Sequence, residues 1–352
     1  NFKKIFILCG KKSYVDSGAK KNLDKYLKNK ITKHYYKCSS YPEISELKKI
    51  ISVLRNFSPN LIIAIGGGSV LDYAKMANVI EITENLNKQI INYSCPLKKK
   101  LTKLIAIPTT AGSGAEVTSN AVIYINKIKY SVEGEIIKPD YFFLIPKLVI
   151  NATQKIRSSA GFDAIAQAVE SLISKKSNSQ SVKFAKKSLD LSVKYYLDYL
   201  KKPNLDNTSA MCFAANLSGK AINISKTTAP HAVSYPFTSL YNISHGHAVS
   251  LTLEKFLKFN LINYKKANCN FDLNLRFKDI FNIFGVKNIN ELEIFFIEMK
   301  KKAKLEDNFE KLKIKLNLNI DKLISGVNLL RLKNNPVDLN IKDIKTILLK
   351  SN

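Results

Sequence analysis

The segment LIIAIGGGSVLDYAK, residues 61–75, restricts the fold of this chain more than any other stretch. Five apolar residues before a glycine run are typical of a strand buried on both faces, and the residues after the glycines predict a helix. A strand followed closely by a helix is the repeating unit of a parallel sheet that is covered on both sides. This alternation predicts strands over residues 4–9, 61–66, 104–110 and 141–146, and helices over residues 18–29, 43–57 and 69–80.

From about residue 151 the pattern changes to helical periods alone. Amphipathic stretches predict helices over residues 161–174, 181–200 and 209–222, and lysine-rich ones continue to the end of the chain. A length of 352 residues is sufficient for two cores. We therefore expect an α/β, Rossmann-like dinucleotide-binding domain over residues 1–150, an all-helical metal- and substrate-binding domain over residues 151–352, and a cleft between them.

The formal net charge of +28 raises the question of nucleic-acid binding. The excess is nearly all lysine, is spread from end to end, and is accompanied by no basic motif with interleaved aromatic residues. It is more typical of a compositional bias, although its field would attract an anionic substrate or cofactor. We expect a small anionic molecule as the partner, and no nucleic acid.

The apolar runs and the cysteines indicate whether the protein is associated with a membrane and in which compartment it is expected. The longest apolar runs are far too short to span a bilayer, so no membrane partner is expected. Five scattered cysteines without a CxxC pair indicate reduced thiols and a cytoplasmic protein. No stretch has the pattern of a signal peptide, and since the sequence begins at Asn1 rather than Met, we expect further residues before it.

Two polar turns follow successive strands of the expected sheet. Glycines in the first turn let a phosphate approach the backbone, where free N–H groups at the helix start face an anion. Hydroxyls in the second turn, TTAGSG, can reach the same ligand. A glycine run alone is as often a simple tight turn, but two such turns fit a dinucleotide across strand ends. The expected cofactor residues are Gly66, Gly67, Gly68, Ser69, Asp72, Thr109, Thr110 and Ser113.

Three of the four histidines stand in HAVSYPFTSLYNISHGH, residues 231–247. A lone histidine is usually a buried or surface polar group, but a cluster in a histidine-poor chain favours a metal site, because imidazole is a common ligand of Zn²⁺ and Fe²⁺. In GFDAIAQAVES, Asp163 and Gln167 are four residues apart on one helical face. Their oxygens could meet His231 and His245 if that helix faces the cleft.

Four segments resemble those of the iron-dependent alcohol dehydrogenases in order and spacing: GGGSVLDYAK, PTTAGSGAEVT, GFDAIAQAVES and HAVSYPFTSLYNISHGH. The resemblance covers roughly residues 1–260 and implies the dehydroquinate synthase-like fold of that family, a nicotinamide cofactor, a divalent metal (Fe²⁺ or Zn²⁺) and a homodimer. It implies that Asp163, His231 and His245 are metal ligands. Gln167 stands where the family usually has a fourth ligand, a histidine.

Within the family, the chain is similar to the branch that reduces phosphonoacetaldehyde to 2-hydroxyethylphosphonate, which carries Gln and Tyr at the positions of Gln167 and Tyr235. The resemblance implies reversible hydride transfer between the nicotinamide and the aldehyde carbon, with the metal as Lewis acid. Tyr235 or a metal-bound water would supply the proton. His247 would act on the substrate side or, equally, as a hydrogen-bonded residue behind the ligands.

A phosphonate dianion needs cationic and hydroxyl partners. Ser225, Lys226 and Thr227 stand shortly before His231 and are expected to bind the phosphonate together with His247. Lys226 could also be one more solvated surface lysine.

The end of the first predicted strand bears on the choice of cofactor. Members of the family that prefer NAD carry Asp there, whereas this chain has Gly10 followed by Lys11. Loss of the acid favours NADPH over NADH, so both residues are expected to contact the cofactor. Three alternatives stay open: a reductase of another small aldehyde or keto acid, a metal-assisted lyase of the dehydroquinate synthase type, and a nucleotide-binding protein without catalysis.

Overall fold

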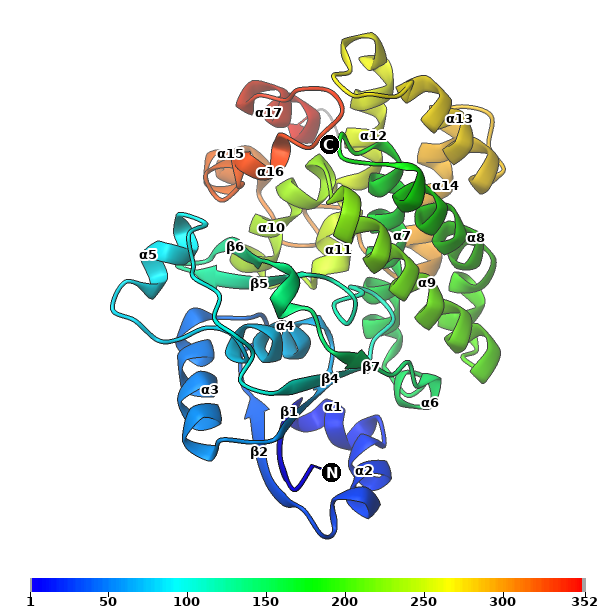
Figure 1. Ribbon diagram of the computed structural model, residues 1–352. Coiled ribbons are helices and arrows are strands. Elements are labelled where there is room, and N and C mark those ends of the chain that lie inside the picture. The colour runs from blue at the N-terminus through cyan, green and yellow to red at the C-terminus, as the bar shows by residue number, and fades with distance from the viewer. Residues whose placement is uncertain (1, 350–352) are drawn as a thin grey trace.

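The computed structural model describes residues 2–349 and places a five-stranded parallel sheet in the N-terminal part of the chain (Figure 1). The strand order is β2-β1-β3-β4-β7, so the chain runs from β1 to β2 on one side and then returns past β1 to β3. In doubly wound sheets of this order, ligands bind where the direction reverses, here between β1 and β3. The strands are β1 (Lys4–Gly10), β2 (Ile31–Lys37), β3 (Leu61–Gly66), β4 (Lys103–Pro108) and β7 (Tyr141–Phe142).

Helices cover both faces of this sheet. On one face α3 and α4 pack against Phe6 and Ile62, and on the other α1, α2 and α6 cover Ile7 and Ile63. Neighbouring residues of one strand thus face opposite cores, which explains why these strands are continuous apolar runs. The helices are α1 (Lys11–Asp16), α2 (Ala19–Leu27), α3 (Ile44–Phe57), α4 (Gly68–Ala77), α5 (Leu86–Ile91) and α6 (Pro146–Val149).

Four strand segments differ from the sequence prediction. The edge strand β2 was not predicted, because its residues are mostly half-buried or exposed and form no apolar run. The antiparallel hairpin of β5 (Asn120–Ile125) and β6 (Ile128–Glu133) interrupts the expected alternation and packs against the helical part through β6. The strand predicted over residues 141–146 is wrong beyond Phe142, because Pro146 begins α6 and lacks the N–H that a strand would need.

From residue 146 to residue 349 the described chain forms helices and no sheet, which confirms the expected fold class. At the centre lies α7, which is buried along most of its length by α8, α9, α12, α13 and α14. A second core joins α10 and α11 to α12, α15, α16 and α17. The bounds are α7 (Gln154–Ile173), α8 (Ser179–Lys201), α9 (Leu205–Ser225), α10 (Ala229–Tyr241), α11 (His245–Ser250), α12 (Leu253–Ile262), α13 (Leu273–Phe284), α14 (Ile289–Ala303), α15 (Leu316–Ser325), α16 (Leu329–Leu332) and α17 (Ile341–Leu349).

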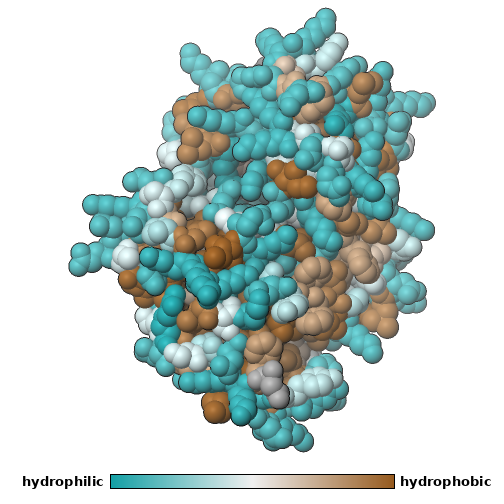
Figure 2. All heavy atoms as spheres, viewed as in Figure 1, coloured by the Kyte–Doolittle hydropathy of each residue, from teal (hydrophilic) through white to brown (hydrophobic). Residues whose placement is uncertain are grey.

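Hydrophilic residues are scattered over the whole face seen in Figure 2 rather than gathered over one element. This distribution agrees with the even spread of lysine along the sequence. Within residues 2–349, no helix has both the length and the apolar character needed to cross a membrane.

Candidate functional site

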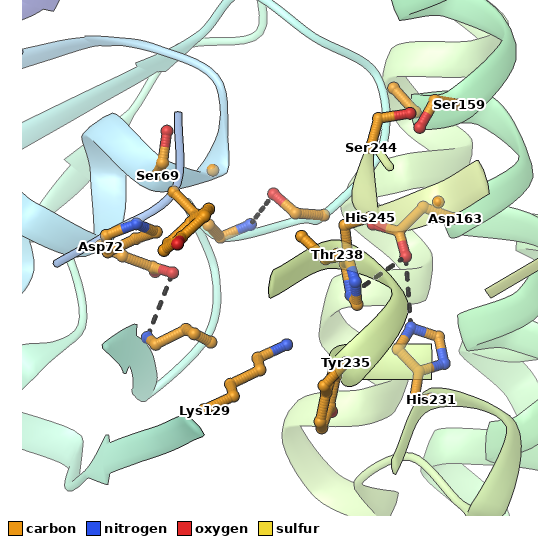
Figure 3. Close-up of a pocket in the computed structure, with 18 of the residues that line it drawn as sticks. Ser69, Asp72, Lys129, Ser159, Asp163, His231, Tyr235, Thr238, Ser244 and His245 are labelled. Carbon is orange, nitrogen blue, oxygen red and sulfur yellow. Dashed lines mark hydrogen bonds and ion pairs between the residues drawn. The ribbon is translucent and has the colours of Figure 1, made fainter. Parts of the chain in front are cut away.

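Three helices bring Asp163, His231 and His245 together (Figure 3). Asp163 lies in the middle of α7, His231 in the first turn of α10, and His245 at the first position of α11. The Oδ1 atom of Asp163 is 3.2 Å from Nε2 of His231 and 3.8 Å from Nε2 of His245. One ligand atom from each residue lies within 4.8 Å of the other two, so the three side chains form a possible metal site.

A glycine allows α11 to come this close to α7. A Cβ atom at Gly246 would overlap the carbonyl oxygen of Ser159 and would lie 2.9 Å from the Cβ of Asp163. Any other residue would therefore push the two backbones apart. The glycine between the two histidines of the HGH motif thus sets the approach of His245 to Asp163.

A second carboxylate on α7 holds the ring of His231. Glu170 lies two turns after Asp163 on the same helical face, and its Oε2 atom is hydrogen-bonded to Nδ1 of His231. Its Oε1 atom accepts hydrogen bonds from the backbone N–H groups of Thr228, at 3.0 Å, and His231, at 3.2 Å. Such a carboxylate fixes the ring and leaves Nε2 for a metal. The sequence prediction missed Glu170, although its spacing of seven residues from Asp163 is a usable signal.

The electrostatics of this cluster suit a divalent cation. Burial raises the pKa of Asp163, but His245 and His231 outweigh burial and lower it, so the carboxylate stays ionised. Burial, followed by the charge of Lys129, lowers the pKa of His245 well below its usual range, which leaves a neutral imidazole. Burial also lowers the pKa of His231, but Glu170 and Asp163 outweigh it and raise it to about 9, so this ring must lose the proton on Nε2 when it binds an ion. Two imidazole nitrogens and a carboxylate oxygen are a donor set that fits Fe²⁺ or Zn²⁺.

Gln167 lies beside this cluster with its amide nitrogen toward it. The Nε2 atom donates to Oδ2 of Asp163 at 3.3 Å, while Oε1 accepts a hydrogen bond from the hydroxyl of Ser218 at 3.0 Å. In this orientation Gln167 positions Asp163. Ligation through its oxygen would require the amide to turn and to release Ser218, and it stays a prediction.

Replacing Glu170 by Gln is expected to weaken metal binding by about 10–100-fold, because the ring of His231 loses its carboxylate partner. The dissociation constant for Zn²⁺ can be measured by competition with a chromophoric chelator. Glu116→Gln is a matched control, since Glu116 is also buried but is bonded to Asn216 outside the cluster. Unchanged affinity in Glu170→Gln would contradict the role given to Glu170.

The metal-site residues open onto a cavity of about 500 Å³ between the sheet and the helices. Residues that follow β3 and β4 line its opposite side, as Figure 3 shows for Ser69 and Asp72. A single cavity therefore joins the predicted cofactor turns to the predicted metal ligands. The predicted cofactor residues that line it are Gly68, Ser69, Asp72, Thr110 and Ser113.

The two turns touch each other through small residues. A Cβ atom at Gly68 would lie 2.7 Å from the hydroxyl oxygen of Ser113, so glycine permits this contact. No described side chain caps the start of α4 after Gly67, which leaves its first N–H groups free for an anion. Thr109 is buried behind the turns, where its N–H donates to the carbonyl oxygen of Gly66 at 3.0 Å.

Gly10 and Lys11 stand at the reversal point of the sheet. Gly10 ends β1, next to β3, and Lys11 begins α1 with an exposed side chain. On the far side of the turns, Asp72 accepts a hydrogen bond from the N–H of Val122 at 3.1 Å. The predicted cofactor residues thus surround the carboxyl ends of β1, β3 and β4, and their contacts with a cofactor stay predictions.

The structure separates the residues predicted to bind the phosphonate. Thr227 lines the cavity, whereas Ser225 and Lys226 are not among the described residues that do so. The hydroxyl of Ser225 is buried and bonded to that of Ser171 at 2.8 Å. The ammonium of Lys226 forms an ion pair with Glu133 at 3.1 Å.

His247 points away from the cavity. Its Nε2 lies 2.6 Å from the carbonyl oxygen of Glu306, and its backbone N–H donates to the hydroxyl of Ser159. Among the described residues that line the cavity, His245 is present and His247 is absent. His247 therefore packs behind the metal site in this structure.

Tyr235 lies in the wall of the cavity beside the metal site. Its ring stacks on that of His245, with ring centroids 5.7 Å apart. The ammonium of Lys129 lies 3.6 Å from the centroid of the same ring, as a cation–π contact (Figure 3). Tyr235 thus links the metal residues to a buried cation.

Three cations of the cavity wall were missed by the sequence prediction: Lys129 on β6, Lys155 on α7 and Arg331 on α16. Lys129 is one of many lysines in a lysine-rich chain, so its type carries no signal. Arg331 is one of only four arginines in the sequence. That scarcity is a signal, but nothing in the sequence places Arg331 near the histidines.

Comparisons with known proteins agree with this geometry. Residues 1–146 match the family model "Iron-containing alcohol dehydrogenase", and residues 158–352 match "Fe-containing alcohol dehydrogenase family, C-terminal". Phosphonoacetaldehyde reductase of Streptomyces viridochromogenes is 29% identical over 217 residues, which are 59% of this chain and 55% of that protein. The chain therefore spans little more than half the length of that relative, and matches to other curated relatives span three fifths of their length or less.

Several solved structures, including a sulfoacetaldehyde reductase and an alcohol dehydrogenase, resemble nearly the whole chain. Sulfoacetaldehyde reductase of Bifidobacterium kashiwanohense, solved in complex with NAD⁺, superposes with a TM-score of 0.86 at 25% identity, over 99% of this chain and 91% of that one. The alcohol dehydrogenase ADH/D1 from an archaeal, halo-thermophilic Red Sea brine pool source superposes with a TM-score of 0.90 at 20% identity, over 100% of this chain and 92% of that one. The second likeness shows the fold alone.

Proposed function

Because the chain belongs to the family of iron-containing alcohol dehydrogenases, we propose that it is a metal-dependent, nicotinamide-linked reductase of a small anionic aldehyde. The proposed substrate is phosphonoacetaldehyde, and the product of the reversible reaction is 2-hydroxyethylphosphonate. The observation that carries this proposal is the single cavity that joins the metal cluster to the glycine turns and has three cationic side chains in its wall. We also propose that the protein is a cytoplasmic homodimer.

Two similar proteins support the substrate class. One is named a phosphonoacetaldehyde reductase and the other a sulfoacetaldehyde reductase, so both names describe a two-carbon aldehyde with an anionic group. The cationic wall of the cavity suits such a substrate, because its anionic group would be a counterion for side chains such as Lys129, which forms no ion pair within residues 2–349.

The side chains of the cavity have different roles in the proposed reaction. When bound, a divalent ion supplies a Lewis acid and the nicotinamide supplies or accepts the hydride. Asp163, His231 and His245 would hold the ion, while Glu170 keeps His231 in its orientation. Burial raises the pKa of Tyr235, so its hydroxyl stays protonated and can donate a hydrogen bond to the oxygen of the substrate.

The test compares aldehydes with and without the anionic group. Protein loaded with Fe²⁺ or Zn²⁺ is expected to oxidise NADPH with phosphonoacetaldehyde at a kcat/KM at least ~10²-fold above that with acetaldehyde, since a site built for a polar group rejects an analogue that lacks it. Equal efficiency would point to a reductase of neutral aldehydes. Absence of turnover with every aldehyde tried would favour a nucleotide-binding protein without catalysis.

A further inference from the structure

We propose that Arg331 binds the anionic group of the substrate and is the residue that selects a charged aldehyde. The inference rests on the proposed function and adds the residue that would recognise the substrate. Arg331 lines the cavity from α16, far along the chain from the predicted metal ligands. Three observations support it: the way α16 is held, the unsatisfied donors of the guanidinium, and the charge of the surrounding wall.

Buried hydrogen bonds fix α16 against the start of α10. The side chain of Asn334 donates to the carbonyl oxygen of Thr227 at 2.9 Å, and that of Asn335 accepts from the N–H of Ala229 at 3.4 Å. Both asparagines are buried, at 8% and 0% exposure. Since α10 carries His231 and Tyr235, these bonds hold Arg331 at a set position relative to the metal site.

The guanidinium of Arg331 is incompletely paired. Its Nε and Nη2 atoms are buried and have no hydrogen-bond partner among residues 2–349. The nearest carboxylate oxygen, Oε1 of Glu133, is 3.7 Å from Nη2, and the other oxygen of Glu133 is paired with Lys226. Buried donors without partners are costly, and an arginine fork matches two oxygens of a phosphonate.

The neighbouring wall is also positive. The ammonium of Lys129 has a cation–π contact with Tyr235, but no hydrogen bond or ion pair to any side chain in the described part of the chain. Burial, followed by the positive charge of Arg331, lowers the pKa of Lys129 to about 7. Two like charges in one cavity wall repel each other. An anionic group between them would relieve this repulsion.

This location differs from the one predicted from the sequence. Ser225, Lys226 and His247 have other partners and do not line the cavity as described above. Of that predicted group, Thr227 alone faces the cavity within the described residues, and Asn334 ties Thr227 to α16. The two assignments therefore predict different effects for substitutions at Arg331 and Lys226.

The test is Arg331→Met, which removes the charge and keeps an unbranched side chain. It is expected to lower kcat/KM for phosphonoacetaldehyde by about 10²-fold, because one partner of a buried charge pair is lost, and to change kcat/KM for acetaldehyde by less than about 3-fold. The affinity for 2-hydroxyethylphosphonate, measured by calorimetry on metal-free protein, should fall by a similar factor. Arg331→Lys should retain part of the kcat/KM for phosphonoacetaldehyde and part of the affinity for 2-hydroxyethylphosphonate. Lysine keeps the positive charge but lacks the two parallel N–H donors of the guanidinium.

Two control variants separate the outcomes. Arg276→Met removes an arginine that packs on Phe271, away from the cavity, and Lys226→Met tests the site predicted from the sequence. Arg276→Met should leave the two kcat/KM values within about 3-fold of the wild type, as expected for a charge near the surface. Lys226→Met should lower kcat/KM for phosphonoacetaldehyde less than Arg331→Met does, since Lys226 is connected to Arg331 only through Glu133. If Arg331→Met keeps the wild-type preference, the inference is wrong while the proposed function stands. If the wild type itself shows no preference for phosphonoacetaldehyde, both are wrong.

Discussion

His245→Ala is expected to release the bound metal and to lower reductase activity by at least ~10³-fold, since a metal contributes several kcal/mol of carbonyl polarisation and each ~1.4 kcal/mol is tenfold. Asp163 and His231 would remain, but two side-chain ligands seldom hold an ion that normally has three or four. The side chain of His245 is about one-third exposed at the cavity wall, so its truncation leaves the packing of α11 on α7 in place. Metal content after gel filtration and NADPH oxidation check this result.

Two further histidine variants make the test specific. His34→Ala is the matched control, because His34 lies on the edge strand β2 beside Tyr14 and Tyr36. His247→Ala distinguishes the sequence-based role from the observed position, since a residue behind the metal site should affect metal affinity more than substrate affinity. Stoichiometric metal in His245→Ala would contradict the assignment of the cluster.

The HGH motif shows what the sequence could and could not reveal. Residues two apart on a helix point to nearly opposite sides, so His245 and His247 cannot face the same cavity once α11 forms. The expectation that His247 acts on the substrate side neglected this geometry, whereas the alternative of a hydrogen-bonded residue behind the ligands agrees with it. The glycine between them is informative for a different reason, because it shows that this turn of helix must pack closely against another backbone.

The parallel sheet could be predicted because strands buried on both faces leave continuous apolar runs in the sequence. The edge strand β2 and the hairpin of β5 and β6 could not, since half-exposed strands leave weaker patterns. The hairpin matters for the site because β6 carries Lys129 and Glu133. The sequence alone does not identify cavity residues that come from such segments or from the four-residue helix α16. Their place in the cavity wall is seen only in the folded structure.

The metal cluster could be predicted from the sequence because its members stand in short motifs with helical spacing. The partner of His231, Glu170, belongs to the same motif as Asp163 and was accessible by the same logic. Arg331 was not, because its approach to α10 depends on hydrogen bonds from Asn334 and Asn335. Tertiary contacts of this kind leave no periodic signal.

The choice between NADPH and NADH depends on the carboxyl end of β1. Gly10 lies there with ordinary extended backbone angles, so another residue is tolerated without strain in φ and ψ. A Cβ atom at this position would, however, lie 2.7 Å from the hydroxyl oxygen of Ser13. Ser13→Ala is therefore the background in which an acid at position 10 can be tested cleanly.

The wild type and Ser13→Ala are both expected to use NADPH with a higher kcat/KM than NADH, and adding Gly10→Asp should reverse this order. A carboxylate beside the 2′-phosphate would cost several kcal/mol through like-charge repulsion, and each ~1.4 kcal/mol is tenfold, so the NADPH-to-NADH ratio should fall by about 10²–10³-fold. The same carboxylate can accept hydrogen bonds from the ribose hydroxyls of NADH. Lys11 and Lys12 remain in all three proteins, so their charge cannot account for the change. A wild type that prefers NADH would show that the missing acid at the end of β1 does not decide the cofactor.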